Sequence, residues 1–215
     1  DSSARNAVAN GSAGVLVKNL VNWEEDKSSL TSKKVIAKYP GTIGNSIKVS
    51  VCPSSTGDLA FFDSALAPGN WVVDGIKMHA LFDAAPGTSA QVAQHTADAG
   101  DEVHVVVYDE DGGISGTPGT ILETYAYLSL ATDAKTDDGS TNNVAEVLNN
   151  NSRYVWIASL ATEFTGISTA ATFTGSGDSA VNYSLGSGVH TALDVGDYQF
   201  GFDQYEDEEN IQVDF

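Results

Sequence analysis

The residues that could carry chemistry are an acidic turn at 109–113, four histidines and one cysteine. The turn reads Asp-Glu-Asp-Gly-Gly, and carboxylates are ligands for Ca²⁺. An EF-hand loop needs oxygen ligands at positions one, three and five, glycine at six and glutamate at twelve. A loop starting at Asp109 has glycine at four and Thr120 at twelve, and one starting at Asp133 has Lys135 at three. We therefore expect a hairpin turn here and no metal site.

The other candidates lack the partners that catalysis needs. No two histidines have the i, i+4 spacing of a zinc site, and no Gly-x-Ser-x-Gly nucleophile motif occurs. Cys52 has no activating residues beside it in the sequence, and no dinucleotide or phosphate fingerprint is present. A Ser-His-Asp triad is a spatial arrangement, so a hydrolase stays open as an alternative. We expect no enzyme, no cofactor and no catalytic residues. The four histidines are His79, His95, His104 and His190.

The charge of the chain excludes two classes of partner. The net charge is −19, with only ten Lys and Arg among 215 residues. Nucleic acids and anionic membranes are bound by clustered basic side chains, so neither is an expected partner. No apolar run approaches the ~20 residues that span a membrane. A single cysteine excludes an internal disulfide. The four acids at 206–209 follow Asp203 and form either a solvated helix face or a contact for a neighbouring subunit.

The elements that must position these residues are short strands. Residues 35–51 predict a strand, a type II turn at Tyr39-Pro40-Gly41-Thr42, a second bend at Gly44 and a half-buried strand from Ile47. Further strands are expected at 103–108, 120–128 and 154–160. A helix capped by Asn143 is also expected, with Glu146 completing a capping box. On 120–128 the even-numbered residues should face one way and the odd-numbered ones the other. The expected fold is mainly β (α+β), a two-layer β-sandwich flanked by a few short helices.

The chain divides into three expected parts. Residues 1–34 form a leading loop, a short apolar segment and a charged connector. Residues 35–200 form the β-sandwich domain. Residues 201–215 form an acidic helix and the start of a strand that belongs to a following, truncated domain. The start without Met and the end inside a strand-like run indicate a fragment of a longer protein.

Several motifs, taken in order, resemble the contractile-tail sheath proteins of T-even-like myoviruses. The first is Lys-Tyr-Pro-Gly at 38–41 with Gly-Asn-Ser-Ile-Lys-Val at 44–49. The second is the run from Val105 through the acidic turn, followed by Thr-Pro-Gly-Thr-Ile-Leu-Glu at 117–123. A serine- and acid-rich loop, the helix at 143–148 and Asn-Asn-Ser-Arg-Tyr-Val at 150–155 complete the series. Residues 4–7 and 15–19 are also similar. The resemblance covers 4–158, and 195–215 more faintly.

The resemblance implies a structural role. In this family, many subunits form a helical sleeve around the tail tube, which shortens to drive genome delivery into a bacterial host. It implies partners in other sheath subunits and, through regions outside this chain, the tail tube and baseplate. It also implies a location in the virion tail after assembly in the bacterial cytoplasm. The chain by itself is expected to be monomeric. The alternative is a carbohydrate- or calcium-binding adhesin-like β-sandwich module, which the acidity and the Thr, Asn and Ser content favour.

The charge also predicts how salt affects stability. At −19 the folded chain repels itself, and added salt shortens the Debye length from ~30 Å at 0.01 M to ~10 Å at 0.1 M. We expect the melting temperature to rise modestly between these two concentrations of NaCl in a thermal scan. A fall would show that surface ion pairs outweigh the repulsion.

Overall fold

The computed structural model describes residues 4–9, 13–54, 71–160, 164, 167–175 and 179–190, with residues 195, 196, 198 and 199 in a helical turn. A four-stranded antiparallel sheet has the order β7-β6-β3-β9. A three-stranded antiparallel sheet has the order β1-β2-β8, and β4 and β5 form a separate hairpin. The prediction of a mainly β fold with a few short helices is confirmed. The strands are β1 (Asn6–Val8), β2 (Val35–Pro40), β3 (Ile47–Pro53), β4 (Val72–Val73), β5 (Ile76–Lys77), β6 (Glu102–Asp109), β7 (Thr120–Ser129), β8 (Val155–Ile157) and β9 (Val181–Ser184).

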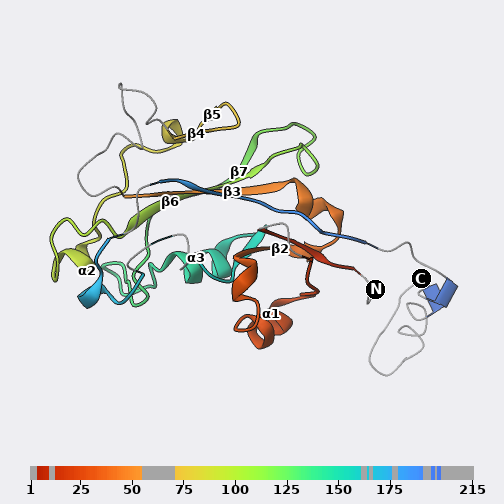
Figure 1. Cartoon of the computed structure of the whole chain (residues 1–215), viewed down its shortest axis with the longest axis horizontal. Coiled ribbons are helices and arrows are strands. Elements are labelled where there is room, and N and C mark those ends of the chain that lie inside the picture. Colours follow the sequence, from red (N-terminus) through yellow and green to blue (C-terminus); the bar gives the residue numbers. More distant parts are fainter. Residues whose placement is uncertain are drawn as a thin grey trace, which may run out of the picture.

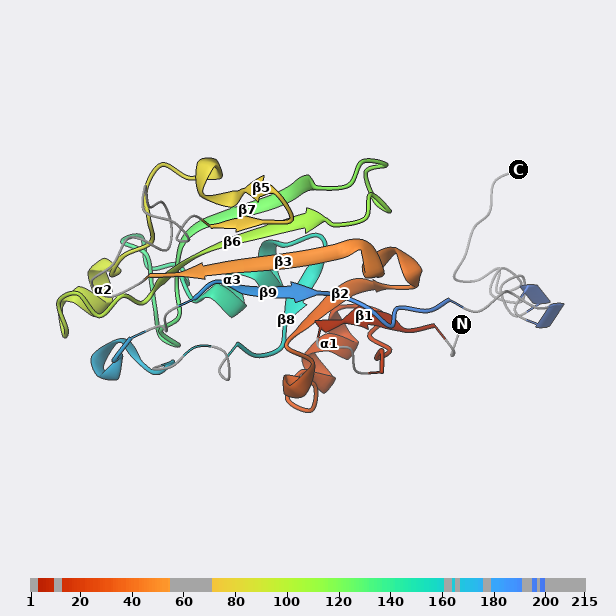
Figure 2. The ribbon, with the colours of Figure 1, turned by 45° about the horizontal axis from the view of Figure 1, so that its top comes forward.

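Helical elements cover the sheets and their ends. The α-helices are α1 (Leu20–Asp26), α2 (Ala90–Ala93) and α3 (Val144–Asn151). The 3₁₀ helices are η2 (Thr31–Lys33), η3 (Thr42–Ser46), η5 (Met78–Leu81) and η6 (Ala170–Thr172). Figure 1 shows the layers in order, with the β4–β5 hairpin, the four-stranded sheet, a layer that holds both α3 and β2, and then α1. Figure 2 shows β7, β6, β3 and β9 side by side, with β1, β2 and α1 toward one end.

The main core lies between the two sheets. Odd-numbered residues of β3 and β6, such as Val49 and Val105, face Val35 of β2, Val155 of β8 and Leu148 of α3. Because strand side chains alternate between faces, the even-numbered residues of β3 and β6 point to the opposite side of the sheet. There they meet the segment that carries β4 and β5, and Cys52, Trp71, Met78, Val106 and Tyr108 form a second cluster. The two central strands are therefore covered on both faces.

Double coverage corrects the prediction of a half-buried β3. Ser50 is fully buried, and its hydroxyl accepts the indole N–H of Trp71 at 2.8 Å. Cys52 on the same face is also buried, whereas Lys48 is only half-buried. A half-buried strand would turn both Lys48 and Ser50 to solvent, but Trp71, which lies 21 residues beyond Ser50, covers Ser50.

The turn before β3 differs from the predicted type II turn. Gly41 has the expected positive φ of 120°, but its ψ of 177° is far from the ψ near 0° of a type II turn. The chain then enters η3 instead of making a second left-handed bend, and Gly44 does not have a positive φ. Gly44 is required for space: a Cβ there would lie 2.6 Å from the Ala37 Cβ and 3.0 Å from the Ala7 Cβ.

Bulges correct the predicted alternation of β7. Val105 pairs with Tyr125 and Val103 with Leu128, so β7 has an extra residue where Tyr127 adopts a φ of 54°. A second irregularity lies between the pairs of Val107 and Tyr108. As a result Leu122, Tyr125 and Leu128 all pack against the main core, although their numbers differ in parity. Each extra residue moves the side chains that follow it to the opposite face of the sheet.

The ends of the chain also differ from the expected loop and connector. Asn6 lies in β1, where its side-chain amide donates to the carbonyls of Val17 and Ala37 and accepts from the N–H of Val17. The expected connector contains α1, whose Trp23 stacks on Trp156 with ring centroids 5.2 Å apart. The helix and strand expected after residue 200 lie outside the described residues.

The capped helix is confirmed. The side chain of Asn143 accepts the N–H groups of Ala145 and Glu146, which have no partner within the helix. Glu146 does not complete the predicted capping box with Asn143. Its carboxylate accepts instead from the hydroxyl of Thr141.

Candidate functional site

The acidic turn after β6 folds around one buried carboxylate. Asp109 is fully buried, and its Oδ1 accepts the hydroxyl of Ser46 at 2.5 Å. Its Oδ2 accepts the N–H groups of Ile114 and Ser115 and the hydroxyl of Ser115 at 2.6–3.0 Å. The Ser46 hydroxyl in turn accepts the N–H of Gly113 at 2.9 Å. We call this arrangement the Ser46–Asp109 junction; it ties η3 to the β6–β7 hairpin.

The junction explains the ionisation of Asp109. Burial raises the pKa of the carboxyl, but the hydrogen bonds from Ser46 and Ser115 outweigh it and hold the pKa at about 2. Hydrogen bonds that donate to a carboxylate stabilise its charged form. Both carboxylate oxygens accept hydrogen bonds from within the protein. The charge of Asp109 therefore holds the residues of the turn in place. Among the described residues, no group of three or more His, Cys, Asp or Glu side chains is placed to hold a metal ion.

A second set of charges joins the β4–β5 hairpin to the four-stranded sheet. The Lys48 ammonium lies 2.8 Å from carboxylate oxygens of Asp74 and of Glu110. Tyr108 donates its hydroxyl to Asp74 at 2.6 Å. Burial lowers the pKa of Lys48, but these two carboxylates outweigh it and raise the pKa overall. These contacts position the hairpin over the sheet, so Lys48 has a structural role.

His104 supports the bulge in β7. Its Nδ1 accepts the backbone N–H of Tyr127 at 3.1 Å, so its Nε2 carries the proton and donates to the Ala84 carbonyl at 2.8 Å. Phe82 stacks on the imidazole with centroids 4.2 Å apart. The side chain is fully buried, and burial lowers the pKa of His104 although Asp83 nearby acts to raise it. A neutral, doubly hydrogen-bonded imidazole is a structural group here.

The stability of the protein should therefore decrease as pH falls from 7.5 to 5. The pKa of His104 is lowered on folding, so the unfolded chain binds more protons below its ordinary value of 6.5. Stability is then lost as pH falls from that value through the lower folded-state pKa, by at most about 1.4 kcal/mol per pH unit. Urea unfolding at each pH measures this slope.

The matched variants are His104→Gln and His95→Gln. His95 is exposed, so its replacement removes an imidazole without removing the buried one. We expect a shallower slope in H104Q and an unchanged slope in H95Q. Equal slopes in wild type and H104Q would contradict the role assigned to His104.

Within the described residues, the remaining candidates occupy separate parts of the fold. Cys52 is fully buried, and burial raises the pKa of its thiol to about 12, so it is a poor nucleophile. His190 is exposed, and its Nδ1 lies 3.2 Å from the Thr42 hydroxyl. Asp133 accepts the N–H of Ala170 at 2.6 Å and so ties the loop after β7 to η6. The acids at 206–209 lie outside the described residues.

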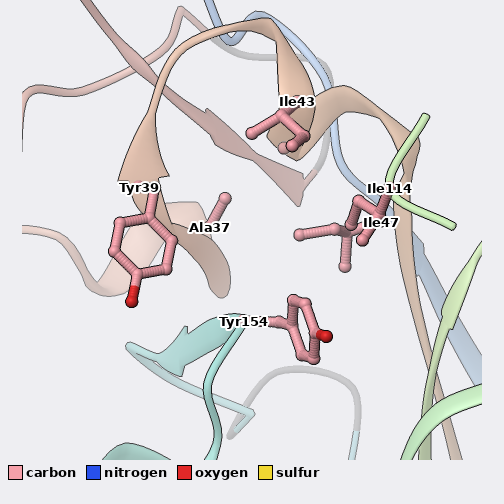
Figure 3. Close-up of a pocket in the computed structure, with 7 residues that line it drawn as sticks. Ala37, Tyr39, Ile43, Ile47, Ile114 and Tyr154 are labelled. Carbon is pink, nitrogen blue, oxygen red and sulfur yellow. The ribbon is translucent and has the colours of Figure 1, made fainter.

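An apolar pocket opens beside the Ser46–Asp109 junction. It has a volume of about 190 Å³, and Figure 3 shows Tyr39, Ile43, Ile47, Ile114 and Tyr154 arranged around it with Ala37. Tyr39 and Ile43 are 63% and 51% exposed, which is high for large apolar side chains. Contact of large apolar side chains with water is unfavourable. Contiguous exposed apolar surface therefore marks interaction sites.

A second pocket shares Tyr39 with the first but opens on the other face of β2, because Ala37 lines the first pocket and Lys38 lines the second. It has a volume of about 360 Å³, and its lining includes Lys18, Leu20, Lys38 and Trp156. Leu20 is 59% exposed. We call the first, apolar pocket the Tyr39 groove. The second pocket is lined by two lysines, Lys18 and Lys38.

The two lysines of the second pocket differ in their contacts. Lys38 donates to the carbonyls of Asn149 and Ser152 at 3.0 and 2.5 Å, and its ammonium lies 5.6 Å from the Trp156 ring centre. Burial lowers the pKa of Lys38, with Glu123 acting to raise it. Lys18 is exposed and pairs with no carboxylate in the part of the chain that the structure describes.

The sequence reasoning missed this groove, although two signals pointed to it. Tyr39 and Ile43 are large apolar residues inside a turn rich in glycine and polar residues, where solvent-facing side chains are expected. Six of the ten basic residues also lie between Arg5 and Lys38. Neither signal shows which residues share a surface, because Ile114 and Tyr154 come from the β6–β7 hairpin and the segment before β8.

Comparison with protein-family models and with curated proteins gave no match. In the described ranges, no helix is both long and apolar enough to cross a membrane.

Proposed function

We propose that this chain is the outer, mainly β domain of a contractile-tail sheath protein, with a structural and non-enzymatic role. The observation that carries the proposal is the Ser46–Asp109 junction. Its residues come from two separate motifs of the resemblance, Gly-Asn-Ser at 44–46 and Asp-Glu-Asp-Gly-Gly at 109–113. In the fold these motifs contact each other directly through the Ser46 hydroxyl and the Asp109 carboxylate. Motifs that share a structural contact are a stronger basis for resemblance than motifs that share only an order.

A second contact supports the same proposal. The side chain of Asn45 donates to the Gly188 carbonyl at 3.0 Å and accepts the Gly188 N–H at 2.7 Å. The Gly-Asn-Ser motif therefore links β3, the β6–β7 hairpin and the segment after β9. A sheath subunit has to keep its shape while the sleeve around it rearranges. Central strands covered on both faces and joined by buried hydrogen bonds suit that requirement, because close-packed interiors resist deformation.

The test is to express the gene product that carries this chain, with and without its tail-tube protein, and to inspect both by negative-stain electron microscopy. We expect hollow helical sleeves or tubes from the gene product. We expect the 215-residue chain alone to sediment as a monomer of 22.4 kDa at tens of micromolar. A gene product that stays monomeric beside its tube protein would contradict the proposal.

Two further outcomes would change the proposed function. Helical polymers formed by the 215-residue chain alone would place assembly in this domain and overturn the expected monomer. A melting temperature raised several degrees by millimolar Ca²⁺ or by a glycan, but not by NaCl of equal ionic strength, would favour the adhesin-like alternative, because a ligand that binds only the native state stabilises it.

A further inference from the structure

We propose that residues 71–85 form a cover that opens as a unit while the two sheets stay folded, and that Lys48 is the latch that keeps it closed. This inference does not depend on a role in a tail sheath. The cover contains β4, β5 and η5. Figure 1 shows the β4–β5 hairpin on the face of the four-stranded sheet opposite to α3 and β2.

The chain leaves the sheet and returns to it at one residue of β6. The N–H of Ser54, directly after β3, donates to the Glu102 carbonyl at 2.9 Å. The Glu102 N–H donates to the Gly87 carbonyl at 3.0 Å, and the Gly87 N–H donates to the Glu102 carboxylate at 2.8 Å. Both ends of the excursion are therefore fixed at Glu102, and the cover between them can move while the sheet keeps its place.

Side chains of the sheet hold the cover. β4 and β5 pair with each other in a separate two-stranded sheet. Lys48 and Tyr108 both donate to the Oδ2 of Asp74, at 2.8 and 2.6 Å. Opening of the cover breaks such side-chain contacts and leaves the ladder pairs of β3, β6, β7 and β9 intact. Further hydrogen bonds across this contact run from Trp71 to Ser50, from Tyr127 to Asp83 and from His104 to the Ala84 carbonyl.

The cluster beneath the cover is small and separate from the main core. Its buried members among the described residues are Cys52, Trp71, Met78, Val106 and Tyr108, and of these Trp71 and Met78 come from the cover. Regions with few buried apolar contacts open at a lower free energy than the core of a protein. The cover therefore opens more readily than the sheets unfold, and opening exposes Cys52.

Lys48 is the latch because its charge joins the cover to the four-stranded sheet. Its ammonium lies 2.8 Å from carboxylate oxygens of Asp74 on the cover and of Glu110 after β6. The Lys48 side chain is 12% exposed, so salt screens this contact less than it screens a surface ion pair. Two carboxylates that share one ammonium repel each other once it is removed. Loss of the Lys48 charge therefore favours the open state, in which Asp74 moves away from Glu110.

The reactivity of Cys52 tests the proposal in the full 215-residue chain, because this single cysteine is fully buried beneath the cover. The probe is a neutral aromatic disulfide, dithiodipyridine. The thiolate of Cys52 attacks one sulfur, forms a mixed disulfide and releases the coloured thiopyridone. The release rate is measured at urea concentrations below the unfolding transition. We expect its dependence on urea to be at most about half that of global unfolding, because the open cover exposes less surface.

Two variants separate opening of the cover from unfolding of the whole chain. Lys48→Met keeps an unbranched side chain on β3 and removes the ammonium, so the release should be about tenfold faster. Val155→Ala removes methyl groups from the main core, so it lowers global stability and should leave the release rate in the absence of urea unchanged. Lys27→Met removes a lysine from the exposed pair with Glu24 and should also leave the rate unchanged.

Three results would overturn the proposal. The first is a release rate with the same urea dependence as global unfolding. The second is a V155A protein that reacts as much faster as K48M does, and the third is equal rates in K48M and wild type. If K48M fails to fold, Asp74→Asn removes the charge from the cover instead, and asparagine tolerates the positive φ of 51° at this position. The release from D74N should also be faster than from wild type, and an equal rate would overturn the latch.

Discussion

Replacing Asp109 by asparagine should lower the free energy of unfolding by about 3 kcal/mol at neutral pH. The Asp109 carboxylate accepts four hydrogen bonds, from Ser46, Ile114 and Ser115. The asparagine side chain has one acceptor oxygen and one NH₂ group, so at least one buried donor would face another donor. Leaving a buried donor without an acceptor costs about 1–3 kcal/mol, and more where the lost partner was charged. Urea unfolding followed by far-ultraviolet circular dichroism measures the difference.

The control for this variant is Asp111→Asn, which makes the same change of charge in the same turn. The Asp111 side chain is exposed, so its replacement should change the free energy of unfolding by less than about 0.5 kcal/mol. A loss in D111N equal to that in D109N would show that net charge, and not the junction, determines the effect.

The same variant has a defined pH signature. The pKa of Asp109 is about 2 in the folded protein against an ordinary value of 3.8, so the charge stabilises the fold above pH 4. That stabilisation is lost as pH falls from about 4 to about 2, because the folded carboxylate then has to be protonated. The acid unfolding curve of D109N should be shallower than that of the wild type in this interval. Parallel curves would contradict the assigned pKa.

Replacing Gly44 by alanine should destabilise the protein by about 2–3 kcal/mol. The added methyl group would lie 2.6 Å from the Cβ of Ala37 in β2 and 3.0 Å from the Cβ of Ala7 in β1. Both neighbours are methyl groups fixed to strand backbones, so neither can rotate away, and η3 has to move from the sheet. Overpacking of this kind costs about 1–3 kcal/mol. The φ of Gly44 is not positive, so its backbone conformation allows alanine. The loss of stability therefore comes from the steric clash of the methyl group.

Gly186→Ala is the matched substitution for this prediction. No atom lies within 4 Å of a Cβ built at Gly186, and its φ is not positive. There the new methyl group should leave stability unchanged or raise it slightly, because alanine restricts the unfolded chain. Thermal melts of G44A and G186A are compared directly. A G44A protein as stable as G186A would mean that η3 is not held against β1 and β2.

Local sequence patterns predicted the features that depend on a few adjacent residues. The β-branched run at 103–108 predicted β6, since such side chains fit a pleated sheet. Asn143 before an apolar stripe predicted the start of α3, and Gly41 after a proline predicted a positive φ. The spacing of the acidic turn predicted a hairpin, and residues 110–119 connect β6 to β7. Each of these features is determined within about ten residues of chain.

The candidate site could not be predicted from local sequence patterns, because its residues come from segments that are distant in the sequence. The acidic turn was recognised, but not that Asp109 is buried beneath it, because its partner Ser46 lies 63 residues away. The alternation on β7 failed at Tyr127, where the imidazole of His104, 23 residues away, accepts the N–H of the bulge. The Tyr39 groove was not predicted at all, since it exists only where η3, β2 and Tyr154 meet.

The sequence by itself determined that the chain forms short antiparallel strands, that α3 begins at Asn143, and that basic residues gather near its start and acidic residues near its end. Composition and local dihedral preference suffice for these properties. Tertiary structure alone decided that Ser50 and Cys52 are buried, that Gly44 is needed for space, and that Tyr39 and Ile43 line a pocket with Ile114 and Tyr154. These properties depend on which surfaces pack together, because burial and contact arise between segments that are far apart along the chain.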